Sequence, residues 1–433
     1  MEVRVASKQF IKPSSTTPPH PATLNPTFLD QLPLLPFIPL VFFYFDHPPI
    51  DSLKASLAET LTLFYRLAGV VKDDMSTVDC NDQGAYFVEA RAKGRMRDLL
   101  ARPDQRLINQ LFPPNAHMLE SARVTNIQAN TFECGGIAIA CCLRHIYTDL
   151  NGLANFLHAW AAATAFRDRS AVRAPNFITP MLFPASSNDM CIHDTARAMR
   201  APFAAAGRFT IKRLLFNRDS VKKLQDEAVS GEIYRTPSRF EAVSACLWKS
   251  FIKASTINRG AIIQSQLRAA TLPLDEQSMG NIVLHSCAKQ PESDQLTTHS
   301  ETYGQKIREE VKKVDGSVVA RLHYEGSGAL KSLLDELSKE LASCGDMLGI
   351  SSWCNFGLND LNFGKEKPVW VAPGFLVEPE NNKIGHICFL LDAADGYGVE
   401  AWFLSTEAYV GPLVSDLGQY KVVSVDPSPV RSS

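Results

Sequence analysis

The chain has 433 residues, 45% of them hydrophobic, and a formal net charge of −2 at neutral pH. A single hydrophobic core rarely extends beyond about 250–300 residues, so two domains are expected. The nearly balanced charge supplies no general attraction for nucleic acid or an acidic membrane surface, and neither partner is expected.

The cysteines and the apolar stretches bear on location. The ten cysteines include no C-x-x-C pair, and several stand in apolar segments, so they are interpreted as small buried hydrophobic residues. The N-terminus, MEVRVASKQFIKP, lacks the continuous apolar segment of a secretory signal. The apolar stretch Leu32–Phe45 contains three prolines and is shorter than the roughly 20 residues of a membrane-spanning helix. A cytoplasmic protein without a membrane segment is therefore expected.

The first elements follow from composition and periodicity. The residues up to about Asn25 are rich in Pro, Ser and Thr, which predicts an arm without regular structure that lies over the fold. Leu40–Tyr44 predicts a strand. Apolar residues at helical spacing predict a helix over residues 51–69, with Asp51 or Ser52 as its N-cap.

A strand-to-helix junction is predicted near the middle of the first half. Residues 121–143 predict two strands that meet around Asn130 and Thr131. The second strand is nearly all apolar, as expected when both faces of a strand are buried. Helical spacing returns from Leu153 onward. His145 is therefore expected between the end of a buried strand and the start of a helix.

The second half begins after a stretch that loses periodicity. Residues 176–207 contain scattered prolines, which is typical of a connection between domains. A strand is predicted over residues 209–216, and helices are predicted over 238–254 and 330–341. Short strands are predicted around Trp370, Ile387–Leu390 and Val399–Phe403.

The segment CCLRHIYTDLNG places His145 and Asp149 four positions apart. On one helix the two side chains would share a face as an ion pair or as metal ligands, but the predicted turn separates them. A metal site needs three or four suitably spaced ligands, and the other histidines form no H-x-x-x-H or H-E-x-x-H pattern. No metal site is expected.

Two interpretations of His145 remain open on the residues alone. The chain has no G-x-S-x-G motif of a serine hydrolase and no glycine-rich loop for nucleotide phosphates. His145 is then either a hydrogen-bonded histidine at a strand end or a general base. As a general base, it would take a proton from a substrate hydroxyl or amine.

Other segments accompany H-x-x-x-D in a consistent order along the chain. They are DSLKASLAETLTLFYRLAG, VDCNDQGAYFVEA, TPSRFEAVSACLWKS, QSMGNIV, SSWCNF, NFGKEKPVWV and DGYGVEAW. With these segments the chain resembles the BAHD family of plant acyl-CoA-dependent acyltransferases over nearly its whole length. IKPSSTTPPH, FLDQL and SSWC are most similar to the branch of alkaloid and terpenoid O-acetyltransferases.

The resemblance implies a chloramphenicol-acetyltransferase-like α/β fold. Such a fold has two similarly built mixed-sheet domains with helices and a channel between them. For this chain it predicts an N-terminal acyltransferase domain over residues 1–185, a crossover loop over 186–207 and a C-terminal acyltransferase domain over 208–433. His145 is expected midway along the channel, where acyl-CoA arrives from one mouth and the acceptor from the other.

The resemblance also implies a reaction without a covalent enzyme intermediate. In a ternary complex, His145 deprotonates the acceptor, which attacks the thioester carbonyl and expels CoA thiolate. A thiol pKa of about 8.5 makes this leaving group tolerable. Asp149 is expected to order the turn, held by Arg268 of the second domain, a role compatible with capping the next helix. Ser352 and Cys354 are the candidate donors to the oxyanion.

One family motif is altered in this chain. D-F-G-W-G is replaced by Asn362, Phe363, Gly364, Lys365 and Glu366. The resemblance assigns this motif a structural role near the CoA mouth. The change removes a carboxylate and a glycine, so an unusual CoA affinity or donor preference is expected.

The sequence therefore predicts an acyl-CoA-dependent O-acyltransferase of plant specialised metabolism. Acetyl-CoA is the expected co-substrate, an alkaloid hydroxyl is the expected acceptor, and no permanently bound cofactor is expected. A cytoplasmic monomer without nucleic-acid or membrane partners is expected. Two alternatives remain open: a non-catalytic BAHD-like accessory or binding protein, and an ester or thioester hydrolase that uses His145 to activate water.

Overall fold

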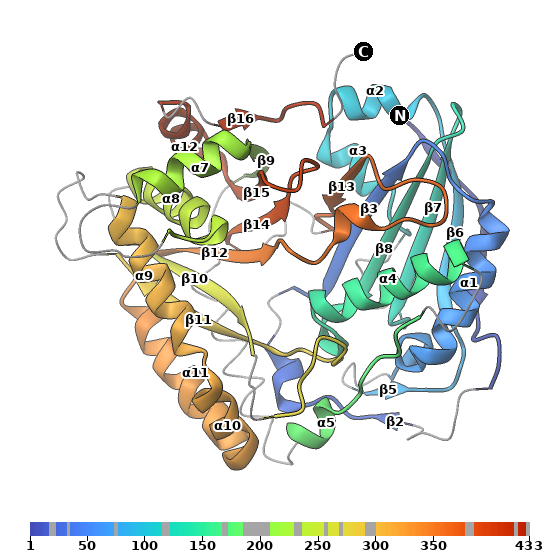
Figure 1. Ribbon diagram of the computed structural model, residues 1–433, viewed down its shortest axis with the longest axis horizontal. Helices are drawn as coiled ribbons and strands as arrows, with labels where there is room; N and C mark the ends of the chain where they lie inside the picture. The colour runs from blue at the N-terminus through green and yellow to red at the C-terminus, as the bar shows by residue number, and fades with distance from the viewer. Residues whose placement is uncertain are drawn as a thin grey trace.

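Two mixed β-sheets, each accompanied by helices, stand side by side in the computed structural model (Figure 1). The structure describes residues 1–16, 23–32, 35–72, 77–114, 122–166, 172–184, 208–228, 236–254, 259–267, 272–290, 300–376, 385–419 and 423–429. The predicted α/β class with two mixed-sheet units is confirmed. The predicted crossover loop, residues 186–207, lies outside the described residues, so the domain limits stay a prediction.

In the described part of the chain, the first sheet has six strands in the order β1-β6-β7-β8-β3-β13. Only β6 and β7 are parallel neighbours. The strands are β1 (Val3–Ile11), β3 (Phe37–Tyr44), β6 (Ala85–Ala92), β7 (Thr125–Phe132), β8 (Ile137–Arg144) and β13 (Trp370–Pro373). Strands β3 and β8 are buried at every residue, which explains their continuous apolar sequences. Strand β13 comes from the second half of the chain and completes this sheet.

The second sheet has seven strands within the described residues, in the order β11-β10-β12-β14-β15-β9-β16. Strands β10, β12 and β14 are parallel, and the other neighbours are antiparallel. The strands are β9 (Phe209–Phe216), β10 (Arg259–Gln266), β11 (Val283–Lys289), β12 (Asp346–Trp353), β14 (His386–Asp392), β15 (Val399–Thr406) and β16 (Val423–Val425).

Helices and smaller elements surround the two sheets (Figure 1). The first half contributes α1 (Ile50–Leu63), α2 (Met96–Ala101), α3 (Gln105–Asn109), α4 (Leu150–Phe166) and α5 (Thr179–Leu182). The second half contributes α7 (Arg218–Glu227), α8 (Arg239–Lys253), α9 (Ser300–Lys313), α10 (Gly316–Glu325), α11 (Ser327–Ala342) and α12 (Glu407–Gln419). A small sheet contains β2 (Thr23–Leu24), β4 (Val70–Val71) and β5 (Val78–Asp79), and the 3-10 helices are η1 (Phe28–Gln31), η2 (Tyr65–Ala68), η3 (His145–Tyr147) and η6 (Leu358–Asp360). No helix of the described residues has the length and apolar character needed to cross a membrane.

The prediction of an irregular N-terminal arm is wrong for Val3–Ile11. These residues form β1 and pair with β6 along nearly the whole strand. Strand β1 lies at the edge of its sheet, and its side chains are all at least partly exposed, so its sequence needs no buried apolar face. Composition alone therefore concealed a strand that backbone pairing stabilises.

Two local predictions also need correction. The turn between β7 and β8 lies at residues 133–136 rather than at Asn130 and Thr131. Asn130 is fully buried inside β7, where its side-chain amide donates to the carbonyl oxygens of Leu111 and Ala138. Helix α1 follows Pro49 without a side-chain cap, so neither Asp51 nor Ser52 is its N-cap.

The buried carboxylate of Glu400 connects the two sheets. Nη1 of Arg213, on β9, lies 2.8 Å from Oε1 of Glu400, on β15, and the two side chains are 3% and 6% exposed. Trp370 of β13, in the first sheet, donates its indole N–H to the other oxygen of Glu400 at 3.3 Å. The Arg213 guanidinium also lies 5.0 Å from the centre of the Trp370 ring. One carboxylate therefore binds a partner from each sheet.

Replacing Glu400 by Gln is expected to lower the free energy of unfolding by about 3–5 kcal/mol, because the buried Arg213 charge loses its counter-ion. Urea denaturation at neutral pH measures this difference. Asp226→Asn is the matched control, since it breaks the exposed Lys222–Asp226 pair of α7, and exposed pairs contribute little to stability. Equal losses in the two variants would show that the buried pair has no special role.

Candidate active site

His145 begins the short helix η3, directly after the buried strand β8 and before α4. The predicted junction between a buried strand and a helix start is therefore confirmed. The backbone N–H of His145 donates to the carbonyl oxygen of Pro36 at 2.9 Å, which continues the pairing of β8 with β3. The position of the histidine backbone is thus fixed by a strand that is buried throughout.

A residue of the second half holds the imidazole. Nδ1 of His145 lies 2.9 Å from Oδ1 of Asn281. The side-chain Nδ2 of Asn281 donates to the carbonyl oxygen of His145. Asn281 is fully buried, so these bonds are not exchanged for bonds to bulk water. The sequence alone does not reveal this role, because the only local signal of Asn281 is a polar side chain between Gly280 and Ile282.

Asp149 joins the same turn to the second half. Its Oδ1 accepts the N–H of Gly152 at 3.0 Å, which is a helix N-cap bond to α4. Its Oδ2 accepts the N–H of Ile282 at 3.2 Å, and its backbone N–H donates to the carbonyl of Gly280 at 3.1 Å. The capping role is therefore confirmed. The predicted partner Arg268 lies outside the described residues, and that ion pair stays a prediction.

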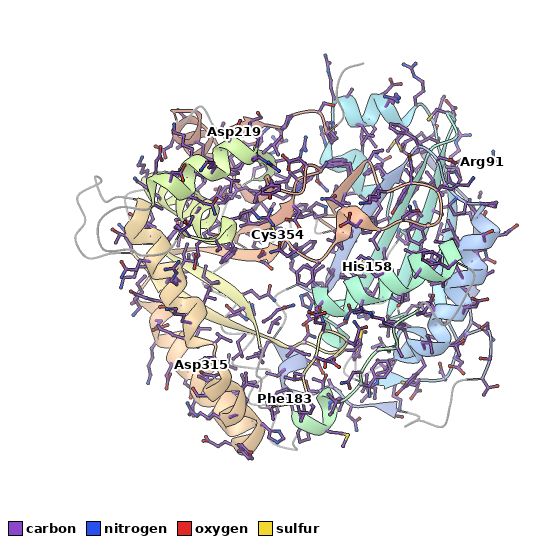
Figure 2. All side chains as sticks on the ribbon, in the orientation of Figure 1. Arg91, His158, Phe183, Asp219, Asp315 and Cys354 are labelled. Carbon is purple, nitrogen blue, oxygen red and sulfur yellow. The ribbon has the colours of Figure 1, made fainter. Side chains whose placement is uncertain are left out.

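A cavity of about 600 Å³ lies between the two halves, and His145 is in its wall. The wall includes Ile38, His145, Asp149, Leu150, Ala154 and His158 from the first half, and Phe240, Gln264, Val283, Ser352, Cys354 and Phe356 from the second. Figure 2 shows two of these residues, His158 and Cys354, on elements of opposite halves. The wall thus combines apolar side chains with hydrogen-bonding groups, which can bind and orient a small organic molecule.

The surroundings keep His145 neutral. Burial lowers the pKa of its imidazole below the ordinary 6.5, against hydrogen bonds to its own carbonyl and to Asn281 that raise it. A neutral imidazole is the form that accepts a proton. Burial also lowers the pKa of the neighbouring His285, on β11, to about 4. Both rings are therefore uncharged at neutral pH.

The two oxyanion candidates differ in their hydrogen bonds. Ser352 and Cys354 both line the cavity. The thiol of Cys354 donates to the carbonyl of Leu390 at 3.4 Å, and its backbone N–H donates to Oγ of Ser352 at 3.4 Å. Burial raises the pKa of this thiol to about 12. The donors of Cys354 are thus engaged, which leaves the Ser352 hydroxyl as the remaining candidate of the pair.

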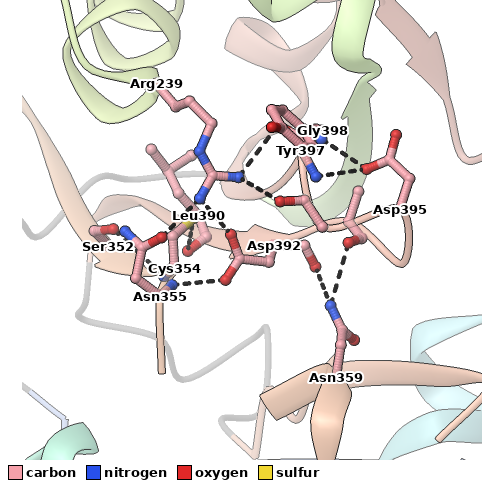
Figure 3. Close-up of polar contacts among 12 residues, drawn as sticks. Arg239, Ser352, Cys354, Asn355, Asn359, Leu390, Asp392, Asp395, Tyr397 and Gly398 are labelled. Atoms are coloured by element: carbon pink, nitrogen blue, oxygen red, sulfur yellow. Dashed lines mark hydrogen bonds and ion pairs between the residues drawn. The ribbon is translucent and has the colours of Figure 1, made fainter. Parts of the chain in front are cut away.

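Arg239 of α8 fixes the turn that follows β12 (Figure 3). Its Nη2 donates to Oδ1 of Asn355 at 2.7 Å and lies 2.8 Å from Asp392 of β14. Asp392 also accepts the backbone N–H of Asn355 at 2.6 Å. Asn355 has φ of 67°, a left-handed conformation that asparagine adopts more readily than most residues. This network holds Cys354 and Phe356 in the cavity wall.

The altered family motif supports α4 and lies outside the described cavity wall. Oδ1 of Asn362 accepts the N–H of Gly364 at 2.7 Å, a bond that an aspartate would make equally. Gly364 has φ of 98°, and a Cβ atom there would lie 3.0 Å from Cα of Ala165. Phe363 is buried, and its ring meets Trp160 of α4 edge-on at 4.9 Å.

Glu366 makes contacts that a glycine at this position would lack. Its Oε1 accepts the backbone N–H groups of Phe45 at 2.5 Å and Asp46 at 2.9 Å, directly after β3. The carboxylate therefore satisfies two donors where a strand ends. The altered motif keeps its turn at Asn362 and gains a link to the first sheet.

Residues 1–410 match the model of a family described as the Transferase family. The chain belongs to this family, the BAHD acyltransferases. This BAHD acyltransferase is 33% identical to epi-neemfruitin B 7-O-acetyltransferase of Melia azedarach, over 99% of this chain and 100% of that protein.

A second relative and a solved structure agree with this assignment. The BAHD chain is 28% identical to salutaridinol 7-O-acetyltransferase of Papaver somniferum, over 92% of this chain and 94% of that protein. The crystal structure of vinorine synthase superposes with a TM-score of 0.76 at 26% identity, over 96% and 98% of the two chains. The predicted family, fold and acyltransferase class are therefore confirmed.

Asn362→Asp is expected to leave the KM for acyl-CoA within about twofold, because substitutions that keep local contacts change free energies by about 0.5 kcal/mol or less. The aspartate oxygen accepts the Gly364 N–H as the amide oxygen does.

Glu366→Ala is the comparison, and it is expected to lower the free energy of unfolding by about 1–3 kcal/mol, since two backbone N–H groups lose their acceptor. Steady-state kinetics and urea denaturation measure the two effects. A tenfold change in KM for Asn362→Asp would mean that the motif acts on CoA.

The contribution of Asp149 to stability is expected to depend on pH. Burial raises the pKa of its carboxyl group from the ordinary 3.8 to about 6, against backbone hydrogen bonds that lower it. The folded state therefore favours the protonated carboxyl group, and protonation of Asp149 stabilises the fold. This stabilisation is complete below pH 3.8 and is lost as the pH rises through about 6. The difference in free energy of unfolding between wild type and Asp149→Asn is expected to shrink by roughly 2–3 kcal/mol between pH 4 and pH 7. Urea titrations at both pH values decide, and a difference that grows with pH contradicts this assignment.

Proposed function

We propose that this BAHD acyltransferase transfers an acetyl group from acetyl-CoA to a hydroxyl group of a polycyclic plant metabolite, with His145 as general base. One observation carries the proposal. A neutral imidazole lies in the wall of a cavity between the two halves, with Nδ1 bound to Asn281. Binding through Nδ1 leaves Nε2 available to accept a proton from the acceptor.

The proposed reaction proceeds through a tetrahedral intermediate. Nε2 of His145 removes the hydroxyl proton of the acceptor while the hydroxyl oxygen attacks the thioester carbonyl carbon. The new C–O bond forms, and the carbonyl electrons move onto oxygen, where the Ser352 hydroxyl donates a hydrogen bond to the oxyanion. The intermediate then collapses, the C–S bond breaks, and the proton on Nε2 passes to the sulfur of CoA. No protein nucleophile is required, because a thiol with a pKa of about 8.5 leaves readily.

Asp149 is proposed to act on the turn and not on the acceptor. Both of its carboxylate oxygens accept backbone N–H groups, from Gly152 and Ile282. Arg268 stays the proposed ionic partner from the second domain. Placing the base is expected to account for about 10²–10⁴-fold of the rate, and bringing two bound substrates together adds several kcal/mol more.

The acceptor is proposed to be an alkaloid or a similarly hydrophobic polycyclic alcohol. The cavity wall includes the apolar side chains of Ile38, Phe240 and Val283 among polar ones. Its volume of about 600 Å³ lies within the roughly 300–1,000 Å³ of ordinary small-molecule sites. The two named relatives are, by their names, O-acetyltransferases for epi-neemfruitin B and for salutaridinol. A cytoplasmic monomer that uses only these two substrates belongs to the same proposal.

Two other functions predict different products. A hydrolase would release free acetate from acetyl-CoA without an acetylated acceptor. A non-catalytic accessory protein would show no turnover with any donor. The altered motif does not favour an accessory role, because Asn362 keeps the hydrogen bond of the turn.

His145→Ala is expected to lower the rate of acetyl transfer at least ~10²-fold, because the general base is lost. The assay incubates purified protein with acetyl-CoA and a panel of alkaloid and triterpenoid alcohols, and mass spectrometry detects the gain of an acetyl group. His323→Ala is the matched control, since His323 lies on α10 and binds the carbonyl of Leu182. Nearly normal transfer by the His145→Ala variant would remove this residue from the mechanism.

A further inference from the structure

The side-chain amide of Asn281 has a hydrogen-bond partner for each of its three polar functions. Nδ2 donates to Oδ1 of Asp30 at 3.1 Å and to the carbonyl oxygen of His145. Oδ1 faces Nδ1 of His145 at 2.9 Å. Along the chain, Asp30 of η1 lies 251 positions from Asn281, and His145 of η3 lies 136 positions from it. Three distant segments therefore meet at one amide.

Two of these partners decide which end of the amide faces the imidazole. A carboxylate and a backbone carbonyl oxygen can accept hydrogen bonds but cannot donate them. The NH₂ end of Asn281 must therefore face Asp30 and the His145 carbonyl. If the amide were reversed, its oxygen would face Oδ1 of Asp30 and the carbonyl oxygen of His145. No hydrogen atom would then be available for a bond to either of them. The amide oxygen is thus directed to Nδ1, which must carry the ring proton.

Hydrogen bonds within its own segment also hold the Asp30 side chain in place. Its Oδ2 accepts the backbone N–H of Thr27 at 2.6 Å, and its own N–H donates to Oγ1 of Thr27, which together form a capping box. Its Oδ1 also accepts the backbone N–H of Asn281 at 3.2 Å. Asp30 is 5% exposed. Both carboxylate oxygens therefore act as acceptors at defined positions.

The titratable groups near this assembly are few among the described residues. Asp149 binds the N–H of Ile282, next to Asn281, and the charge of Asp30 contributes to the raised pKa of Asp149. His285 on β11 interacts electrostatically with His145. Asp149 and His285 only lie near the imidazole of His145. Asp30 is connected to this imidazole by two successive hydrogen bonds through the side chain of Asn281.

We propose that Asp30 is a positioning residue of the acyl-transfer reaction, which acts through Asn281 to keep the proton of His145 on Nδ1 and the lone pair on Nε2. The inference rests on the proposed role of His145 as general base. Asp30 does not line the described cavity wall and is not a catalytic residue. Its role is to select the tautomer that can accept a proton from an acceptor.

Asp30→Ala is the decisive substitution, because it removes the oxygen that accepts both the backbone N–H and the side-chain Nδ2 of Asn281. The bond from the Thr27 N–H to the other carboxylate oxygen is lost as well. The expected result is a fall in kcat of about 10- to 100-fold, part of the 10²–10⁴-fold that a general base supplies, with the KM for acetyl-CoA nearly unchanged. The matched control is Thr27→Ala, which weakens the capping box but leaves the Asn281 contacts of Asp30 intact.

The tautomer is measured directly by ¹⁵N NMR of histidine-labelled protein at neutral pH, with the His145 signals assigned from the His145→Ala spectrum. Wild type is expected to show a protonated Nδ1 and an unprotonated Nε2, and Asp30→Ala is expected to show a mixture of tautomers. Wild-type protein with the proton on Nε2 would overturn the inference without any variant, so a variant that fails to fold leaves the test intact.

The kinetic outcomes separate the two proposals. If His145→Ala abolishes transfer but Asp30→Ala retains normal kcat and the wild-type tautomer, Asp30 has no positioning role, although His145 remains the base. If Thr27→Ala lowers kcat as much as Asp30→Ala does, the effect is structural and the inference is wrong. If His145→Ala retains transfer, the proposed function fails, and the NMR measurement still reports whether Asp30 sets the tautomer.

Discussion

The hydrogen bond between Asn281 and His145 joins the two halves of the chain at the point where the reaction is proposed. On one side, His145 follows a strand that is buried at every residue, so its backbone cannot shift without disturbing the first sheet. On the other side, the residues around Asn281 are tied to the first half by the carboxylates of Asp30 and Asp149. Asp30, Asp149 and Asn281 are buried, and buried polar groups are costly to leave unpaired. The cavity between the halves and the orientation of the imidazole therefore depend on one set of contacts.

Much of the fold follows from periodicity, and its failures have physical reasons. Strands β8 and β9 and helices α8 and α11 carry patterns that burial requires, and they were predicted. Strand β1 was missed because an edge strand with exposed side chains needs no apolar pattern. The turn after β7 was misplaced because Asn130, a residue typical of turns, is here buried and hydrogen-bonded within a strand.

The candidate site was only half predictable. His145 and Asp149 stand in a recognisable motif. Asn281, in contrast, lies 136 positions from His145 and 251 positions from Asp30 along the chain, so no local sequence pattern indicates these contacts. The altered motif shows the reverse case. The loss of a carboxylate at Asn362 predicts an unusual CoA affinity or donor preference, which stays a prediction. The turn itself needs only one acceptor oxygen, and the amide supplies it. Side-chain identity at a motif is therefore best interpreted through the bond that the position has to make.

A crystal structure with CoA and the acetylated acceptor bound tests the central claim most directly. The account predicts that the ester oxygen derived from the acceptor lies within hydrogen-bonding distance of Nε2 of His145, about 2.6–3.2 Å, with the CoA sulfur on the other side of the ester carbon. Nδ1 should remain bound to Asn281 in that complex. A product whose ester lies outside the cavity between the two halves, or one that is approached by Nδ1, would contradict the account.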